Sequence, residues 1–207
     1  MNGHTDWVES VAFGEGNILA SGSYDNSVKI WNAENGQLIR TLNGHTDSVI
    51  SVAFEEGNVL ASGSYDNSVK MWNAENGQLI RTLNGHTDLV RSVAFGQGNI
   101  LASGSVDRSI KIWNAENGQL IRTLNGHTDS VWSVAFGQGN ILASGSVDRS
   151  IKIWNAENGQ LIRTLNGHTY SVRSVAFGQG NILASGSGDS SIKIWNAENG
   201  QLIRFHN

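Results

Sequence analysis

Five near-identical segments of 41 residues make up almost the whole chain. They begin at Gly3, Gly44, Gly85, Gly126 and Gly167, so that 205 of the 207 residues belong to a repeat. Repeats of one kind contact their neighbours along the chain and bury a continuous core only by stacking. We therefore expect a single domain over residues 1–207, built from the units 3–43, 44–84, 85–125, 126–166 and 167–207.

Each repeat contains four segments with the composition of β-strands, separated by turns rich in glycine and asparagine. In the first copy these segments are residues 7–13, 18–23, 27–32 and 37–42. The first two are apolar on both faces, as in a sheet packed between two other sheets, and the fourth is more polar. The pattern predicts an all-β chain of five four-stranded antiparallel meanders. A period near 40 residues, with Gly-His early and tryptophan late, is typical of β-propeller blades.

A meander places its turns alternately at its two ends. In each repeat the Gly-His-Thr turn and the corner between the second and third strands, residues 24–26 in the first copy, share one end. We call this end the top face, and the opposite end the bottom face.

The recurring histidine, serine, aspartate and tryptophan resemble the WD40-repeat family over all five copies. The family's structural hydrogen-bond tetrad corresponds here to His4, Ser21, Asp25 and Trp31; His45, Ser62, Asp66 and Trp72; His86, Ser103, Asp107 and Trp113; His127, Ser144, Asp148 and Trp154; and His168, Ser185, Asp189 and Trp195. Ser23, two residues after Ser21, is an alternative member of the first tetrad. The resemblance implies that these residues stabilise the blades.

Two features depart from the family pattern. The namesake Trp-Asp pair is Trp-Asn in every copy, beginning with Asn32, and the turn after the first strand is shortened to sequences such as Gly-Gln-Gly-Asn. The first change removes one acceptor charge per blade and leaves the tetrad intact. The second changes the loops of the bottom face.

The constant residues do not form a convincing catalytic or metal site. A Ser-His-Asp set resembles a hydrolase triad, but five copies without an oxyanion-hole candidate favour a structural device. Glycosidases need a pair of carboxylates, and Glu9 is the only acidic residue that we place on an inner strand. One histidine per blade is too dispersed to ligate one metal ion. We therefore predict a protein that is not an enzyme, with no cofactor and no metal.

Charge and composition narrow the partners further. The formal net charge is −4, which gives no general attraction for nucleic acid or anionic membranes. The chain has no apolar run long enough for a membrane span, no signal peptide and no cysteine. These features predict a soluble cytoplasmic protein.

Differences between the copies cluster at a few positions at or near the predicted top face. Copying would erase differences without consequence, so these positions are the candidate partner-binding residues. They are Trp7, Glu9, Tyr24, Asn26, Ile50, Tyr65, Asn67, Arg91, Arg108, Trp132, Arg149 and Arg173. WD40-like propellers commonly hold partners on this face, so the resemblance implies a protein or peptide partner. Four arginines favour an acidic or phosphorylated one.

Other readings stay open from the sequence. The variable positions also fit neutral drift on tolerant exposed sites. Near-identical copies without proline fit an engineered or excised symmetric propeller that has no natural ligand. A multivalent sugar-binding propeller is a further alternative, although it needs an exposed aromatic side chain in every copy, and we expect Phe13, Trp31 and their equivalents to be buried.

Closure of the ring is a separate expectation. The first repeat starts on its first strand and the last repeat ends on its fourth, so no strand remains to be exchanged between the first and last blades. We expect a closed five-bladed monomer. The alternative is an open arc that completes a larger ring by homo-oligomerisation through the unsealed seam between blades one and five.

Overall fold

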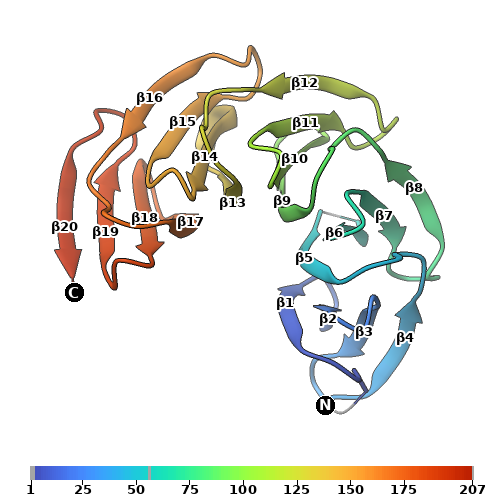
Figure 1. Ribbon diagram of the computed structural model, residues 1–207. Coiled ribbons are helices and arrows are strands. Elements are labelled where there is room, and N and C mark those ends of the chain that lie inside the picture. The colour runs from blue at the N-terminus through green and yellow to red at the C-terminus, as the bar shows by residue number, and fades with distance from the viewer. Residues whose placement is uncertain (1–2, 56, 207) are drawn as a thin grey trace. The chain divides into compact units, whose positions relative to one another are not determined.

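The computed structural model describes residues 3–55 and 57–206 and confirms the all-β fold (Figure 1). The chain divides into two compact units, Met1–Phe95 and Gly96–Asn207, which we call the first and second units. The single domain over 1–207 stays a prediction. The strands are β1 (Val8–Phe13), β2 (Ile18–Ser23), β3 (Val28–Asn32), β4 (Leu38–Leu42), β5 (Val49–Phe54), β6 (Val59–Ser64), β7 (Val69–Asn73), β8 (Leu79–Leu83), β9 (Val90–Gly96), β10 (Ile100–Ser105), β11 (Ile110–Asn114), β12 (Leu120–Leu124), β13 (Val131–Phe136), β14 (Ile141–Ser146), β15 (Ile151–Asn155), β16 (Leu161–Leu165), β17 (Val172–Phe177), β18 (Ile182–Ser187), β19 (Ile192–Asn196) and β20 (Leu202–His206).

These strands form five four-stranded antiparallel sheets, each taken from one repeat in chain order. The strands start one residue later than the sequence predicted at Trp7, Ser27 and Gln37. At Ser27 the backbone N–H donates to the Asp25 carboxylate, at 3.0 Å, so this residue belongs to the corner. At Gln37 the backbone N–H donates to the Asn35 side chain, at 3.0 Å, and the residue belongs to the turn.

The asparagine that replaces the family's aspartate organises the turn after the third strand. Asn32 Oδ1 accepts hydrogen bonds from the backbone N–H groups of Glu34, at 2.9 Å, and Asn35, at 3.0 Å. Gly36 follows with φ of 74°, a left-handed conformation that glycine adopts without steric cost. The amide oxygen of Asn32 thus satisfies two turn donors without a charge.

Consecutive blades pack through a glycine on the second strand of one blade and two valines on the first strand of the next. In the second unit, Gly145 of β14 faces Val172 and Val175 of β17, which are 0% and 6% exposed. The Ser133 hydroxyl also accepts a hydrogen bond from the Val175 backbone N–H, at 3.1 Å. The first unit repeats the bond between Ser10 and Val52, at 3.0 Å. Shape and hydrogen bonding therefore fix the distance between neighbouring blades.

The burial predicted for the phenylalanine that ends the first strand of each repeat is wrong in the first blade. Phe13 is 73% exposed, whereas Phe54 and Phe177 pack against the apolar cores between neighbouring blades. Phe54 lies against the preceding blade, and Phe13 has no preceding blade within its unit. The predicted burial of Trp31 agrees with its exposed fraction of 4%.

A methyl group added at Gly145 should disrupt the contact between blades. An ideal Cβ there would lie 2.7 Å from Val172 Cγ1, so Gly145→Ala should lower the free energy of unfolding by about 1 to 3 kcal/mol through overpacking. Gly186 occupies the same place in the last blade, and a Cβ there meets nothing within 4 Å. Gly186→Ala should be neutral or stabilising by up to about 1 kcal/mol. Urea denaturation measures both, and equal stabilities would contradict this packing role.

Candidate functional site

The structure brings together the predicted tetrad residues. In the fourth blade, His127 Nδ1 lies 2.7 Å from Asp148 Oδ2, His127 Nε2 lies 2.7 Å from Ser144 Oγ, and Trp154 Nε1 donates to the same Oγ at 2.9 Å. The same contacts occur in the first, second and fifth blades, at 2.7 to 2.8 Å. In the third blade the Trp113 indole donates to Ser103, at 2.8 Å.

One tautomer of the histidine satisfies every polar group in this series of hydrogen bonds. A histidine protonated on Nδ1 donates to the aspartate, and its Nε2 accepts the serine O–H while the serine oxygen accepts the indole N–H. This resembles the order of contacts in a hydrolase triad. However, Ser144 is fully buried and its oxygen is already bound by Trp154. The arrangement is therefore that of a buried network that links the blade's strands.

Each tetrad aspartate accepts more hydrogen bonds than the sequence predicted. Asp148 Oδ2 accepts from His127 and from the Thr128 backbone N–H, at 3.0 Å. Asp148 Oδ1 accepts from the Ser150 hydroxyl, at 2.6 Å, and from its backbone N–H, at 2.9 Å. Ser150 was missed because it lies at the start of a predicted strand. Its signal in the sequence is a serine two residues after the aspartate in every repeat.

The serine two residues after the tetrad serine has a separate role. Ser146, the equivalent of Ser23, donates to the Asp129 backbone carbonyl at 3.0 Å and accepts the Asp148 backbone N–H at 3.0 Å. It ties the two corners of the top face together. Ser144, and not Ser146, is therefore the serine that contacts the histidine.

Hydrogen bonding controls the ionisation of these aspartates. Burial by itself would raise the pKa of Asp148, but hydrogen bonds from His127 and Ser150 hold the pKa of this carboxyl well below its ordinary value. Asp66 shows the same lowered pKa, again because hydrogen bonds from His45 and Ser68 outweigh burial. The carboxylates are therefore stabilised in their charged form by the folded state.

Removing one tetrad carboxylate should destabilise the fold. Asp148→Ala leaves His127, Ser150 and the Thr128 N–H without their acceptor, which should cost roughly 1 to 3 kcal/mol. Asp129→Ala is the matched control, because Asp129 is exposed and its carboxylate accepts the Ser130 N–H and hydroxyl. Thermal unfolding should show a clearly lower Tm for Asp148→Ala. Equal Tm values for the two variants would contradict the structural role of the tetrads.

Stability should also fall in acid. An aspartate with a lowered folded pKa contributes its full stabilisation above its unfolded pKa, about 3.9, and loses it as the pH falls through the folded pKa. The unfolded chain binds more protons in this range, so the free energy of unfolding should decrease steadily below about pH 4. Urea denaturation at several pH values measures this slope. Asp148→Asn should have a shallower slope than the parent, and identical slopes would refute the assignment.

A β-bulge positions one of the variable residues of the first strand in the first, second, fourth and fifth blades. The register of β1 against β2 shifts between Val8 and Ser10, which leaves Glu9 as the bulge residue. The same shift makes bulge residues of Ile50, Trp132 and Arg173. Bulges re-aim side chains and are frequent beside functional sites.

In the first unit, four predicted partner-binding residues lie in one row across consecutive blades. The ring centroids of Trp7 and Tyr24 are 5.9 Å apart, and those of Tyr24 and Tyr65 are 6.1 Å apart. The Arg91 guanidinium lies 5.5 Å from the Tyr65 ring centroid and donates to the Tyr65 hydroxyl. A hydrogen bond with Tyr65 and partial burial raise the pKa of Tyr24. We call these four residues the aromatic row.

The other predicted residues of the first unit differ in exposure. Glu9 is exposed, and Asn26 and Asn67 are half-buried at corners with φ of 67° and 68°. Asparagine tolerates this left-handed conformation better than most residues, so both side chains have a local reason for their identity. Ile50 is only 5% exposed and packs inside the unit, so we leave it out of the partner surface.

The second unit has a smaller group of the same kind. The Arg173 guanidinium lies 5.4 Å from the Trp132 ring centroid. Arg108 and Arg149 are exposed at corners with φ of 70° and 71°, where a non-glycine side chain is strained. Tyr170, 57% exposed, was missed, although it stands where the other four repeats have aspartate.

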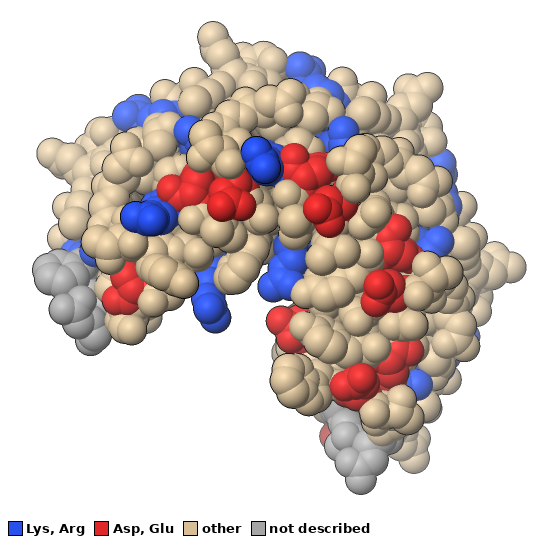
Figure 2. Space-filling model, viewed as in Figure 1, with Lys and Arg blue, Asp and Glu red and all other residues tan. Residues whose placement is uncertain are grey.

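The charged side chains are mixed. On the face of the molecule in Figure 2, acidic side chains recur and basic side chains stand among them. No group of three or more histidine, aspartate or glutamate side chains among residues 3–55 and 57–206 could hold a metal ion.

Comparison with known proteins decides the family. The profile described as "WD domain, G-beta repeat" matches residues 1–32, 36–73, 77–114, 118–155 and 159–196. The chain belongs to the WD40 family. Each later WD40 match begins near the fourth strand of one blade and ends on the third strand of the next. The segment matched by the WD40 profile is thus offset from the structural blade, whereas each 41-residue repeat coincides with one blade.

Solved and curated relatives agree with this fold. The computationally designed Ika8 protein superposes with a TM-score of 0.88 and 37% identity, covering 99% of this chain and 63% of the Ika8 chain. A 42-residue segment is 52% identical to the probable E3 ubiquitin ligase complex SCF subunit sconB of Talaromyces marneffei and of Aspergillus terreus. That match covers 20% of this chain and 6% of the fungal proteins.

Among the residues that the structure describes, none forms a helix with the length and apolar character of a membrane span.

Proposed function

We propose that this WD40 protein is a non-catalytic scaffold that binds a protein or peptide partner through the variable residues of its top face. The aromatic row of the first unit is the observation that carries the proposal. WD40 domains are generally interaction scaffolds, and the constant residues of each repeat are engaged in hydrogen bonds within the blade.

The aromatic row has the features of a binding hot spot. Trp7 is 73% exposed, and Tyr24 and Tyr65 present partly buried rings beside it. Tryptophan, tyrosine and arginine dominate binding energy at protein interfaces because they bury large areas and retain a polar group. Arg91 is held against Tyr65, so little side-chain entropy remains to be lost on binding. The row suits a bulky apolar side chain of a partner.

The arginines give each unit its own preference for acidic groups in a partner. Guanidinium groups bind carboxylates and phosphates with paired hydrogen bonds, so we propose an acidic or phosphorylated peptide. Arg108 and Arg149 keep strained left-handed corners where Asn26 and Asn67 stand in the first unit. Strain of this kind is concentrated at functional positions. Exposed pairs contribute only about 0 to 1 kcal/mol each, so binding should be modest in affinity and weakened by salt.

A peptide-library screen tests this function. The immobilised protein should enrich peptides in which a bulky apolar residue neighbours aspartate, glutamate or phosphoserine. Alanine at Arg91, Arg108, Arg149 and Arg173 together should reduce capture by about tenfold or more, since tenfold corresponds to only about 1.4 kcal/mol over four pairs.

The strand-four arginines provide a matched control. Alanine at Arg40, Arg81, Arg122 and Arg163 removes the same formal charge from β4, β8, β12 and β16, and should leave capture within about twofold. Circular dichroism establishes that both variants are folded. Equal loss in the two sets, or no preference for acidic peptides in the parent, would refute the proposed partner.

A second candidate is a symmetric propeller that has no natural ligand. The near-identity of its repeats and its 37% identity to a computationally designed protein favour this reading. A screen that enriches no peptide sequence would support it over the scaffold.

A further inference from the structure

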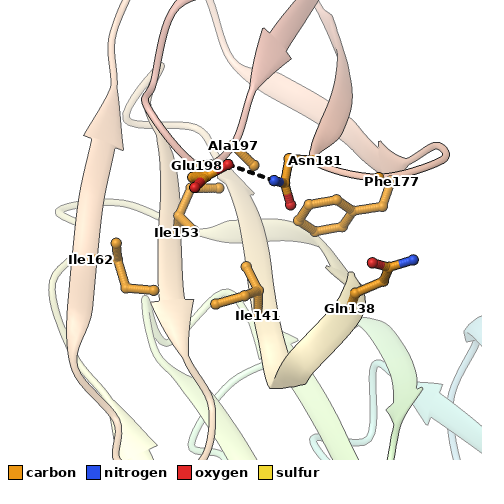
Figure 3. A pocket seen from close by; sticks show the side chains of 9 residues that line it. Gln138, Ile141, Ile153, Ile162, Phe177, Asn181, Ala197 and Glu198 are labelled. Carbon is orange, nitrogen blue, oxygen red and sulfur yellow. Dashed lines mark hydrogen bonds between the residues drawn. The ribbon is translucent and has the colours of Figure 1, made fainter.

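A pocket of about 310 Å³ opens between the fourth and fifth blades, within the second unit and on its bottom face (Figure 3). Its apolar wall is formed mainly by Ile141, Ile153 and Phe177, and its polar edge by Gln138, Asn181 and Glu198. The volume is in the range of small-molecule sites, which combine apolar walls with a few placed polar groups.

The apolar wall continues the core between the two blades. Ile153 of β15 is 1% exposed, while Ile141 at the start of β14 and Phe177 at the end of β17 are partly buried against the same core. Figure 3 shows Ile141 and Phe177 on opposite blades with the polar side chains near them. Packed strands therefore hold the apolar wall in place. A ligand that enters the pocket would bury the parts of Ile141 and Phe177 that are still exposed.

The polar edge is a carboxylate with a neutral partner. Asn181 Nδ2 donates to Glu198 Oε2, at 2.8 Å. The Arg163 guanidinium donates to the backbone carbonyl of Glu198. Among the described residues, the Glu198 carboxylate forms no ion pair. The carboxylate therefore stands beside an apolar wall, and the nearby Arg163 cation is bonded to the backbone carbonyl of Glu198 and not to its side chain.

The preceding pair of blades offers an internal comparison with the same residue types. Asn140 and Glu157 stand where Asn181 and Glu198 stand in the last blade. Asn140 is half-buried, and its Oδ1 is buried without a hydrogen-bond partner among the described residues. The amide–carboxylate hydrogen bond of Asn181 and Glu198 is not made by Asn140 and Glu157. The hydrogen bond between the asparagine amide and the glutamate carboxylate is thus a feature of the last blade's turns.

We propose that this pocket binds a small arylalkylamine. The aromatic ring lies against Ile141, Ile153 and Phe177, and the ammonium group donates a hydrogen bond to the Glu198 carboxylate. A cation is selected because Glu198 accepts hydrogen bonds and carries a negative charge. This site belongs to the second unit and shares no residue with the aromatic row, so the proposal is independent of the proposed peptide binding.

Titration with 2-phenylethylamine tests the proposal on the full chain. Chemical shifts of isotope-labelled isoleucine methyl groups should change in a saturable manner at Ile141 and Ile153, and not at Ile18 or Ile30 of the first unit. The uncharged 2-phenylethanol should bind at least about tenfold more weakly, and 3-phenylpropionate should not bind, since its carboxylate repels Glu198.

Two variants separate the site from nonspecific binding. Glu198→Gln removes the charge and retains the shape, and should weaken amine binding by about tenfold without changing the Tm. Glu157→Gln is the matched control and should leave the affinity unchanged. No saturable shifts, equal binding of the amine and the alcohol, or unchanged affinity in Glu198→Gln would each overturn the proposal.

Discussion

The architecture depends on one carboxylate per blade that accepts hydrogen bonds from several directions at once. Asp148 joins the histidine of the first corner, the backbone that follows it, and the corner serine that precedes the third strand. Without this acceptor both corners of the top face would contain buried donors with no partner. The tryptophan then carries the network across the sheet to the third strand. The tetrad therefore fixes the shape of a blade through contacts made within that blade.

A rigid blade explains how variation is tolerated at its edge. The exposed or half-buried bulge residues and the corners carry glutamate, arginine, tryptophan, asparagine or serine while the neighbouring tetrad stays constant. Because backbone and tetrad bonds satisfy the polar groups beneath, the surface side chains are free to differ. This separation lets one scaffold present an aromatic row in the first unit and a tryptophan–arginine pair in the second.

Much of this could be predicted from the sequence, since a signal repeated in register is easy to recognise. The four strands, the tetrads and the turns all recur at fixed spacing, and the strand bounds differ by one residue where a corner hydrogen bond holds the chain, as at Ser27. Ile50 was assigned to the partner surface because its position varies between copies, and variation alone does not reveal its burial. The aromatic row depends on how three blades pack. Asn181 and Asn140 have the same sequence context but different partners, so no pattern distinguishes them.

The glycine-and-valine contact between blades has a consequence for the history and the folding of such a chain. Every complete repeat carries both halves of the contact, the glycine on its second strand and the valines on its first. Any copy is consequently able to follow any other, so duplication or loss of a 41-residue segment creates a junction that already fits. The same interchangeability means that only the short connections between repeats specify which blade stacks on which. During folding, non-adjacent copies therefore compete for the same contact, and chain connectivity alone selects the correct neighbour.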